Sequence, residues 1–291
     1  MPVFVCPDGH IDRLDRSIAA FVPDMSRSLA RRLIDAGCVF VDGRRCRVAS
    51  RELRSGARVR VEAREAPRAL EPLVTLHADA DLVVVDKPAG MPSAPTRRAA
   101  AATAAEIVRS QRRASGVAAA DVHVVHRLDV PTSGVLVFAC NAAAAAALGE
   151  QFASGTVHKN YVAVVDAPVA DPEGRIDAPL ASVRGHAHVA PDGRTALTEW
   201  RRIGTTAAGT LLAVTPRSGR LHQIRAHLAH AGMPIVGDVA YRGTKADRLH
   251  LHAHRIAFVH PVSGLPLVVE SPLPAVFQVV PSPEELHGSD P

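Results

Sequence analysis

The chain has 291 residues, of which 47% are hydrophobic, 22% are charged and only 3% are aromatic. This length accommodates one large domain, or one medium-sized domain and one small domain. No apolar run approaches the roughly 20 residues that cross a bilayer, and the N-terminus lacks the basic start of a signal peptide. The four cysteines form no CxxC pair, which argues against a disulfide framework or a cysteine-based zinc site. These features predict a cytoplasmic protein without a membrane anchor.

The positive charge is concentrated in the first quarter of the chain. The whole sequence has a net charge of +5, from 34 basic and 29 acidic residues. Residues 1–68 hold 14 arginines and nine acidic residues, and so account for the entire excess. A small cationic part joined to a neutral larger part suggests a polyanion-binding module on a body with another function.

Residues 10–62 form a compact pattern of predicted helices and hairpins. The stretch PDMSRSLARRLIDAG predicts a helix with Ser26 as its N-cap and Gly37 as the left-handed residue that ends it. Arg27 and Arg31 are four residues apart and therefore share one helix face. The next stretch, VFVDGRRCRV, predicts two short strands around an Asp-Gly hairpin turn.

The same segment carries a recognisable set of residues: Arg13-Leu14-Asp15, Ser26-Arg27, Leu33-Ile34, GCVFVDG from Gly37 to Gly43, and Ser55-Gly56. With these residues it resembles the S4 RNA-binding domain, a family that places an arginine-bearing helix and the following hairpin on structured RNA. The resemblance implies that Ser26, Arg27 and Arg31 contact RNA by charge and shape. The alternative is a basic helix face that only meets solvent.

A second, larger pattern begins with the apolar run Leu82–Val85, which predicts a buried strand. The runs Val122–Val125 and Val135–Ala139 predict two more strands, with the loop HRLDVPTSG between them. Charged residues between buried strands lie where a scaffold commonly presents chemistry. On spacing alone, however, Asp129 is more simply explained as an Asx-turn residue.

The loop HRLDVPTSG matches the HRLDxxTSG signature and so resembles the RluA family of RNA pseudouridine synthases. In that family the aspartate of the signature is the catalytic carboxylate, which implies this role for Asp129. The arginine two residues earlier helps to evict the target base and fills its place in the stack, which implies this role for Arg127. The stretch HKNYVAVV (158–165) resembles the second family motif and implies that Tyr161 is an active-site tyrosine on a strand.

The stretch RSGRLHQIRAHLAHAGMPIVGDVAYRG (217–243) resembles the third family motif. Its periodicity predicts a helix over Gly219–Ala231, with apolar residues, Leu221 among them, on a buried face beside Arg225. An arginine beside a buried face needs a carboxylate partner, because its unpaired burial is costly. The resemblance implies that this partner is Asp129.

The predicted fold class is α+β. A small S4-type α/β RNA-binding domain (1–65) and a linker (66–72) precede a pseudouridine synthase catalytic domain (73–280) with a long mixed, mainly antiparallel sheet. A C-terminal tail (281–291) follows.

The predicted function is isomerisation of specific uridines in RNA, with large-subunit ribosomal RNA as the favoured substrate and transfer RNA as the alternative. The base is flipped out, and Asp129 acts as nucleophile or base while the C1′–N1 bond is exchanged for C1′–C5. Tyr161 stacks on the base and is a candidate to remove the C5 proton. The prediction includes no metal, no cofactor and no membrane partner, and a monomer.

Three other hypotheses remain open at this point. A non-catalytic RNA-binding or ribosome-assembly protein would keep the same fold. His250, His252 and His254 alternate and would share one face of a strand, as a metal set does. Ser133 with a nearby histidine and aspartate suggests a hydrolase, although the chain has no GxSxG elbow.

Overall fold

The computed structural model describes residues 2–23, 25–35, 37–62, 72–95, 102–117 and 121–280. The chain forms two compact units, of which the first includes Met1–Glu71 and the second includes Pro72–Ala94 and Thr103–Pro291. The predicted linker (66–72) falls outside the described residues except for its last residue, and the predicted tail (281–291) falls wholly outside them. The exact domain boundaries therefore stay a prediction.

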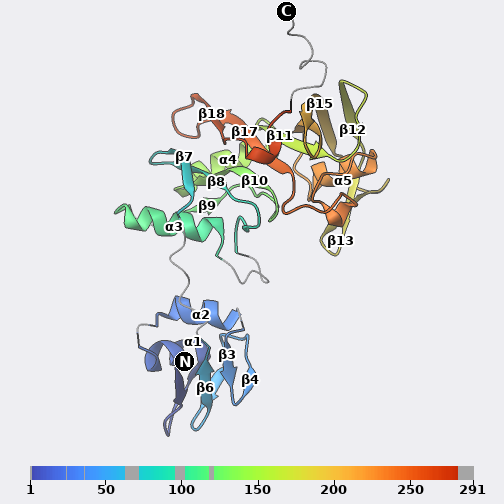
Figure 1. Ribbon diagram of the computed structural model, residues 1–291. Coiled ribbons are helices and arrows are strands. Elements are labelled where there is room, and N and C mark those ends of the chain that lie inside the picture. The colour runs from blue at the N-terminus through green and yellow to red at the C-terminus, as the bar shows by residue number, and fades with distance from the viewer. Residues whose placement is uncertain are drawn as a thin grey trace, which may run out of the picture. The chain divides into compact units, whose positions relative to one another are not determined.

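The N-terminal unit combines two helices with short strands (Figure 1). Its four-stranded sheet has the order β1-β6-β3-β4, and β2 pairs separately with β5. The elements are β1 (Val3–Val5), β2 (Ile11–Arg13), α1 (Leu14–Phe21), α2 (Arg27–Asp35), β3 (Val39–Val41), β4 (Arg44–Arg45), β5 (Glu52–Arg54) and β6 (Arg58–Val61).

Local signals in the sequence determine several of these elements. The Ser26 hydroxyl oxygen accepts a hydrogen bond from the Leu29 backbone N–H at 3.2 Å and so caps α2 as predicted. Gly37, with φ +73°, ends that helix in the left-handed conformation. Asp42 and Gly43 both have positive φ, as the tight turn between β3 and β4 requires. All three predictions are confirmed.

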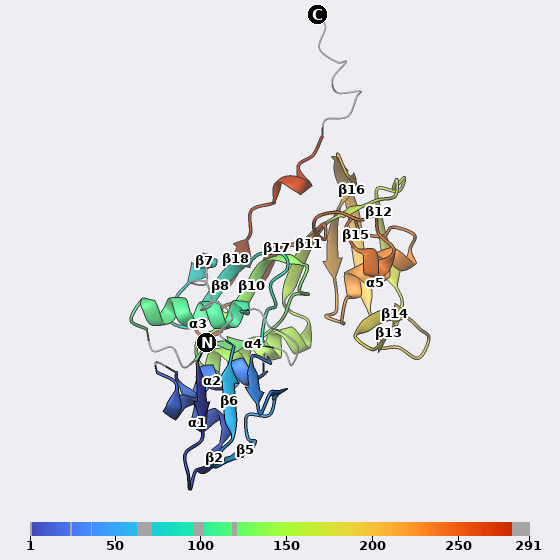
Figure 2. The ribbon, with the colours of Figure 1, turned by 60° about the horizontal axis from the view of Figure 1, so that its bottom comes forward.

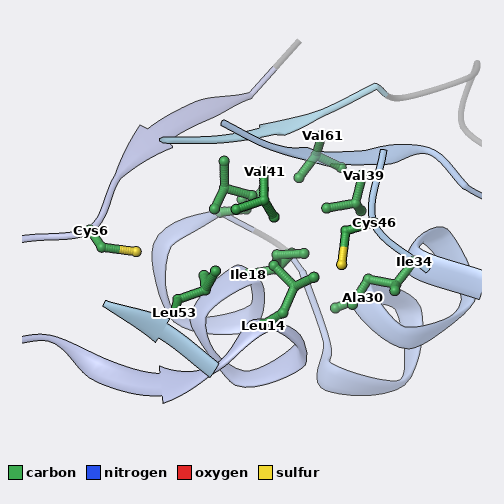
Figure 3. Packing of buried hydrophobic residues seen from close by; sticks show 12 residues of the cluster. Cys6, Leu14, Ile18, Ala30, Ile34, Val39, Val41, Cys46, Leu53 and Val61 are labelled. Carbon is green, nitrogen blue, oxygen red and sulfur yellow. The ribbon is translucent and has the colours of Figure 1, made fainter. Parts of the chain in front are cut away.

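The helices and the sheet of the N-terminal unit enclose one hydrophobic core (Figure 3). Aliphatic and cysteine side chains from both layers meet there: Cys6, Leu14, Ile18, Val22, Ala30, Ile34, Val39, Val41, Cys46, Leu53, Val59 and Val61. The unit has no aromatic side chain in this buried set, so it depends on close packing of small apolar groups.

The second unit is built on a ten-stranded sheet with the order β12-β15-β16-β11-β17-β10-β8-β7, to which β9 and β18 add at β10 and β17 (Figure 2). Its strands are β7 (Val74–Ala78), β8 (Leu82–Lys87), β9 (His123–Val124), β10 (Ser133–Ala139), β11 (His158–Val165), β12 (Glu173–Asp177), β15 (Leu197–Thr206), β16 (Gly209–Pro216), β17 (Leu251–Val259) and β18 (Pro266–Glu270). Only β10 and β17 pair in parallel. The predicted mixed, mainly antiparallel sheet is confirmed.

Helices and a hairpin complete this unit. The helices are α3 (Ala104–Ala114), α4 (Ala142–Ser154) and α5 (Gln223–His230), with short 3-10 turns η1 (Val239–Tyr241) and η2 (Ala275–Phe277). The hairpin consists of β13 (Leu180–Val183) and β14 (His186–Val189), and α5 contacts β14, β15 and β16. None of the helices in the described ranges has the length and apolar character needed to cross a bilayer.

The helix α5 begins four residues later than predicted. His222 has a left-handed backbone (φ 48°), and Leu221, expected on the buried face, is 43% exposed. The Gln223 side chain explains this start. Its amide nitrogen donates to the Leu197 carbonyl and the Thr198 hydroxyl. Its amide oxygen accepts from the Ser218 hydroxyl and the Arg220 N–H. These bonds hold the preceding residues as a loop, and only the later part of the predicted stripe is buried.

Candidate active site

Asp129 lies in the loop between β9 and β10, whose end is fixed by backbone pairing. Gly134 pairs with Ala253 of β17 and has φ +112°, and a Cβ at this position would overlap the Ala253 carbonyl. A glycine is therefore required where β10 meets β17. The Thr132 N–H bonds the Asp129 carbonyl oxygen at 3.1 Å, which closes the turn through the main chain.

The carboxylate of Asp129 is not used for an Asx turn. Within the described part of the chain, its one hydrogen bond comes from the Arg225 Nη1 at 3.2 Å. The contact predicted between Arg225 and Asp129 is thus present. The Asp129 side chain is 23% exposed, whereas that of Arg225 is 7% exposed, so the carboxylate is reachable and its partner is enclosed.

Arg225 has a second and stronger partner that the sequence reasoning missed. Its Nε and Nη2 each donate to the buried Asp238 carboxylate at 2.7 Å, in the bidentate geometry favoured by guanidinium groups. Burial would lower the pKa of Arg225, but Asp238 and Asp129 raise it above the ordinary value. Arg225 is therefore a permanent cation between two carboxylates.

A signal for Asp238 was present in the sequence. A guanidinium has five N–H donors, and one carboxylate cannot satisfy them all when the group is buried. Asp238 stands in the stretch GDVAYRG, in the same motif as Arg225 and 13 residues after it. The resemblance to the family implied only Asp129 as a partner, which leaves donors of Arg225 that Asp238 accepts from.

Tyr241 and His222 are two further neighbours of the Arg225–Asp129 pair. The Arg225 Cζ lies 4.9 Å from the centre of the Tyr241 ring, a cation–π contact. The Tyr241 hydroxyl accepts from the Ala187 N–H and bonds the His222 Nδ1, each at 2.9 Å. The Nε2 of the same imidazole is 3.9 Å from the Asp129 carboxylate.

Lys87 is a buried cation under the same loop. Its Nζ donates to the backbone carbonyls of Pro88, Met91 and Val130 at 2.9, 2.8 and 3.2 Å. Burial lowers the pKa of Lys87 to about 8, although the Asp129 carboxylate opposes this shift. The lysine ties the loop after β8 to the residue that follows Asp129.

Tyr161 is brought to the same region by strand register. It lies on β11 opposite Ala253 of β17, the residue that also pairs with Gly134. One strand therefore separates Tyr161 from the end of the Asp129 loop. Burial, and then the Asp129 carboxylate, raise the pKa of the Tyr161 hydroxyl above its ordinary value, which keeps it protonated.

Arg127 and its neighbour His126 point to different environments. The His126 Nε2 accepts a hydrogen bond from the Val137 N–H at 3.0 Å, and burial lowers its pKa to about 3. The imidazole is therefore neutral and anchors the loop to β10. Arg127 is exposed, and no bond of its guanidinium to another described residue holds it in place. The predicted base-replacing arginine is accessible.

The RNA-binding residues predicted from the S4 resemblance lie in the other unit, with Ser26 just before α2 and Arg27 and Arg31 on it. The Ser26 hydroxyl caps the helix, so its oxygen already has a backbone partner. The Nε atoms of Arg27 and Arg31 donate to the buried Asp15 carboxylate at 3.0 and 2.6 Å. These arginines do not simply project into solvent, and Asp15 is a partner that the sequence reasoning did not assign.

The residues of the hydrolase and metal-site hypotheses are hydrogen-bonded to other groups of the protein. The buried Ser133 hydroxyl bonds the His252 Nδ1 at 2.7 Å and accepts from Arg248, while the His254 Nδ1 donates to the Ser271 carbonyl. Burial lowers the pKa of His252 to about 4. These contacts give Ser133, His252 and His254 structural partners in the sheet.

A different group has metal-ligand spacing among the described residues, formed by Asp79, Asp81 and His260. One Asp79 oxygen already bonds His77 and His260, at 2.7 and 3.1 Å, and the other accepts the N–H groups of Asp81 and Leu82. Both oxygens of Asp79 therefore already have protein partners.

Comparison with known proteins assigns both units. The family model described as RNA pseudouridylate synthase matches residues 81–230, and the S4 domain model matches residues 12–59. An uncharacterized RNA pseudouridine synthase of Chloroflexus aurantiacus is 39% identical over 96% of this chain and 92% of its own length. The ribosomal large subunit pseudouridine synthase D of Xanthomonas campestris is 35% identical over 94% of this chain and 89% of its own.

Solved structures share the fold. The human RNA pseudouridylate synthase domain containing 1 aligns with a TM-score of 0.61 and 23% identity, over 76% of this chain and 96% of its own. The sequence motifs, the family model over more than half of the chain and the similarity of full-length relatives agree. The chain therefore belongs to the RluA family of RNA pseudouridine synthases, isomerases that convert uridine in RNA to pseudouridine, and carries an S4 domain near its N-terminus.

Proposed function

We propose that this enzyme modifies uridines of large-subunit ribosomal RNA, with Asp129 as the reacting carboxylate. The observation that carries the proposal is the half-open Asp129 carboxylate held by the enclosed Arg225 in the signature loop. The choice of RNA is supported by the Xanthomonas campestris relative, whose name assigns it to the large ribosomal subunit. Action on ribosomal RNA also agrees with the predicted cytoplasmic location.

The reaction is an isomerisation in which no atom is gained from a co-substrate. The C1′–N1 bond breaks, the uracil turns, C1′–C5 forms, and the proton lost from C5 is balanced by one gained at N1. Asp129 either attacks C1′ and leaves again as C1′–C5 forms, or removes a sugar proton that is later returned to the sugar, and in both routes it must start ionised. Arg225, itself fixed by Asp238, sets the direction of the Asp129 carboxylate through its hydrogen bond.

Arg127 and Tyr161 would manage the flipped nucleotide. Extrusion of a base from a stem costs a few kcal/mol of unstacking, and an exposed guanidinium that enters the gap offsets part of this cost. The Tyr161 ring is suited to stack on the extruded uracil. Its raised pKa makes the hydroxyl a poor base at neutral pH, so stacking is the role that we favour over removal of the C5 proton.

The N-terminal unit would hold the RNA while the second unit acts on it. The S4 domain is an RNA-binding module by its family, and the excess positive charge of the chain lies in this part. In our proposal Arg27 and Arg31 contact the phosphate backbone, and Ser26 contributes through the helix start that it caps. Such contacts give affinity that falls as salt rises.

A map of pseudouridine in total RNA tests the substrate and the residue together. RNA from cells with and without the gene is compared, and the gene is restored as wild type or as Asp129→Asn. Loss of a large-subunit site that only the wild type restores is the expected result. A lost site in transfer RNA would instead assign the same chemistry to that substrate, and restoration by Asp129→Asn would remove Asp129 from the reaction.

A further inference from the structure

The buried carboxylate of Asp15 is an unusual feature of the N-terminal unit. Asp15 lies in the first turn of α1 and its side chain has no solvent exposure. It bonds the Nε of three arginines: Arg13 at 3.1 Å, Arg27 at 3.0 Å and Arg31 at 2.6 Å. Burial raises the pKa of this carboxyl, but the three guanidinium groups outweigh burial and hold the pKa well below its ordinary value. Asp15 is therefore a permanent anion.

The geometry of the three bonds leaves the outer part of each guanidinium available. All three arginines use Nε toward Asp15, and no described residue accepts a hydrogen bond from their Nη atoms. Their side chains stay 40%, 43% and 47% exposed. Because a guanidinium is planar, a fixed Nε also fixes the two Nη groups, whose N–H donors remain for a further acceptor.

The charge of this cluster also points to an anionic ligand. Three guanidinium groups around one carboxylate leave two positive charges without a partner in the cluster. Nη pairs in a fixed fork match the oxygens of phosphate, which binds arginine in bidentate fashion. Ordering three long side chains in advance removes a cost that a ligand would otherwise meet on binding.

We infer that Asp15 is a positioning residue that orders Arg13, Arg27 and Arg31 into one binding site for the phosphates of an RNA backbone. The inference rests on the proposed RNA contacts of Arg27 and Arg31, and it adds Arg13 as a third. In this inference the buried Asp15 carboxylate increases RNA affinity, whereas a negative charge near RNA would by itself lower it.

The substitution Asp15→Asn distinguishes the ordering of the three arginines from the net charge of the unit. It keeps the side-chain volume and adds one unit of positive charge to the unit. If the arginines act only as a diffuse positive charge, RNA affinity rises. If Asp15 orders them, the dissociation constant for a fluorescein-labelled RNA stem-loop, measured by anisotropy at fixed salt, increases at least about tenfold.

The matched control is Asp12→Asn, which makes the same charge change nearby. Asp12 is 38% exposed and lies 3.7 Å from Arg16, a surface pair of small energetic value. This variant should bind RNA as well as the wild type or slightly more tightly. An Asp15→Asn protein that is folded by circular dichroism and binds as tightly as the Asp12→Asn control would overturn the inference.

A second set of variants leaves the buried acid in place. Arg27→Lys and Arg31→Lys keep the charge, but an ammonium cannot bond Asp15 with one nitrogen and offer two others to a phosphate. Each should bind the stem-loop severalfold more weakly, while the control Arg16→Lys binds normally. Wild-type affinity in both lysine variants contradicts the inference. If Arg27→Ala and Arg31→Ala also bind normally, the proposed RNA contacts themselves fail.

Discussion

In the N-terminal unit three arginines surround one buried carboxylate, whereas in the catalytic unit two carboxylates flank one buried arginine. In each cluster the central ion is buried and held by several bonds. The surrounding ions of opposite charge differ between the two clusters in their solvent exposure. The half-exposed arginines of the first cluster suit an extended polyanion. In the second, Asp238 is enclosed and only Asp129 is open, which suits a single reacting atom.

In both proposals the buried member of each cluster orients the groups around it. Asp15 and Arg225 are the enclosed ions, and each is paired because an uncompensated charge in the interior is strongly destabilising. The exposed members can then contact the substrate in a fixed direction. Substitutions in the two clusters should therefore affect different measurements.

The largest expected effect is that of Asp129→Asn on turnover. We expect kcat to fall at least about 1000-fold, because the amide can act neither as nucleophile nor as base. The formation of pseudouridine in a substrate RNA, measured under multiple-turnover conditions at saturating RNA, checks this. Thermal unfolding and RNA affinity should stay near wild type, since Asp129 is partly open and Arg225 keeps Asp238. A variant with normal turnover would exclude Asp129 from the chemistry.

The next largest effect is expected for Asp238→Asn, which changes the residue that holds Arg225 and leaves Asp129 unchanged. Loss of the bidentate partner leaves Arg225 poorly compensated, and we expect a loss of about 3 kcal/mol in the free energy of unfolding. Turnover should fall about tenfold to 100-fold as Arg225 loses its orientation. Denaturant unfolding and kcat are measured on the same protein. Normal stability with lost activity would instead make Asp238 a direct participant in the reaction.

Removal of residues 1–66 tests whether the arginine cluster of the N-terminal unit contributes to RNA binding. The two units have separate hydrophobic cores, so the second unit should remain folded. RNA affinity should fall, and the slope of log affinity against log salt should flatten by about 2 to 3 units if three arginines meet phosphates. Titrations at several salt concentrations measure this slope. An unchanged slope would locate the cationic RNA surface in the second unit.

The smallest effect near neutral pH is on the free energy of unfolding, whose dependence on acid pH should differ between the two units. His252 has a folded pKa of about 4 and an ordinary value of 6.5, so the unfolded chain takes up its proton first. The stability that it contributes is complete above pH 6.5 and is lost as the pH falls toward 4. The lowered pKa of Asp15 keeps its contribution in the N-terminal unit until the pH is below the ordinary carboxyl value of 3.8.

Trp200, the single tryptophan of the chain, reports on the second unit alone. Its fluorescence during denaturation should show a loss of stability as the pH falls from 7 to 4, to which His126 contributes as well as His252, because burial lowers the pKa of both. The His252 share is less than about 1 kcal/mol between pH 7 and pH 6 and up to about 3 kcal/mol by pH 4. The control His252→Asn can keep a bond to Ser133 but does not titrate, so its pH dependence should be weaker. Equal pH dependence in both proteins would contradict the assignment to His252.

The sequence by itself determined the family, the two kinds of fold and the local elements. The cap at Ser26, the glycine at Gly37 and the apolar strand runs depend on neighbouring residues, so their effect can be read along the chain. The loop with Asp129 was recognised because its motif is contiguous. The catalytic roles of Asp129, Tyr161 and Arg225 stay predictions that the experiments above address.

Only the tertiary structure decided which charges pair. Arg225 meets Asp129 across 96 residues and prefers Asp238, and Arg31 meets Asp15 across 16 residues from another helix. The start of α5 depends on bonds between Gln223 and a distant strand. Periodicity reports which face of a helix is apolar, but a buried ion takes the partner that the packed chain brings within reach, and sequence spacing does not encode that distance.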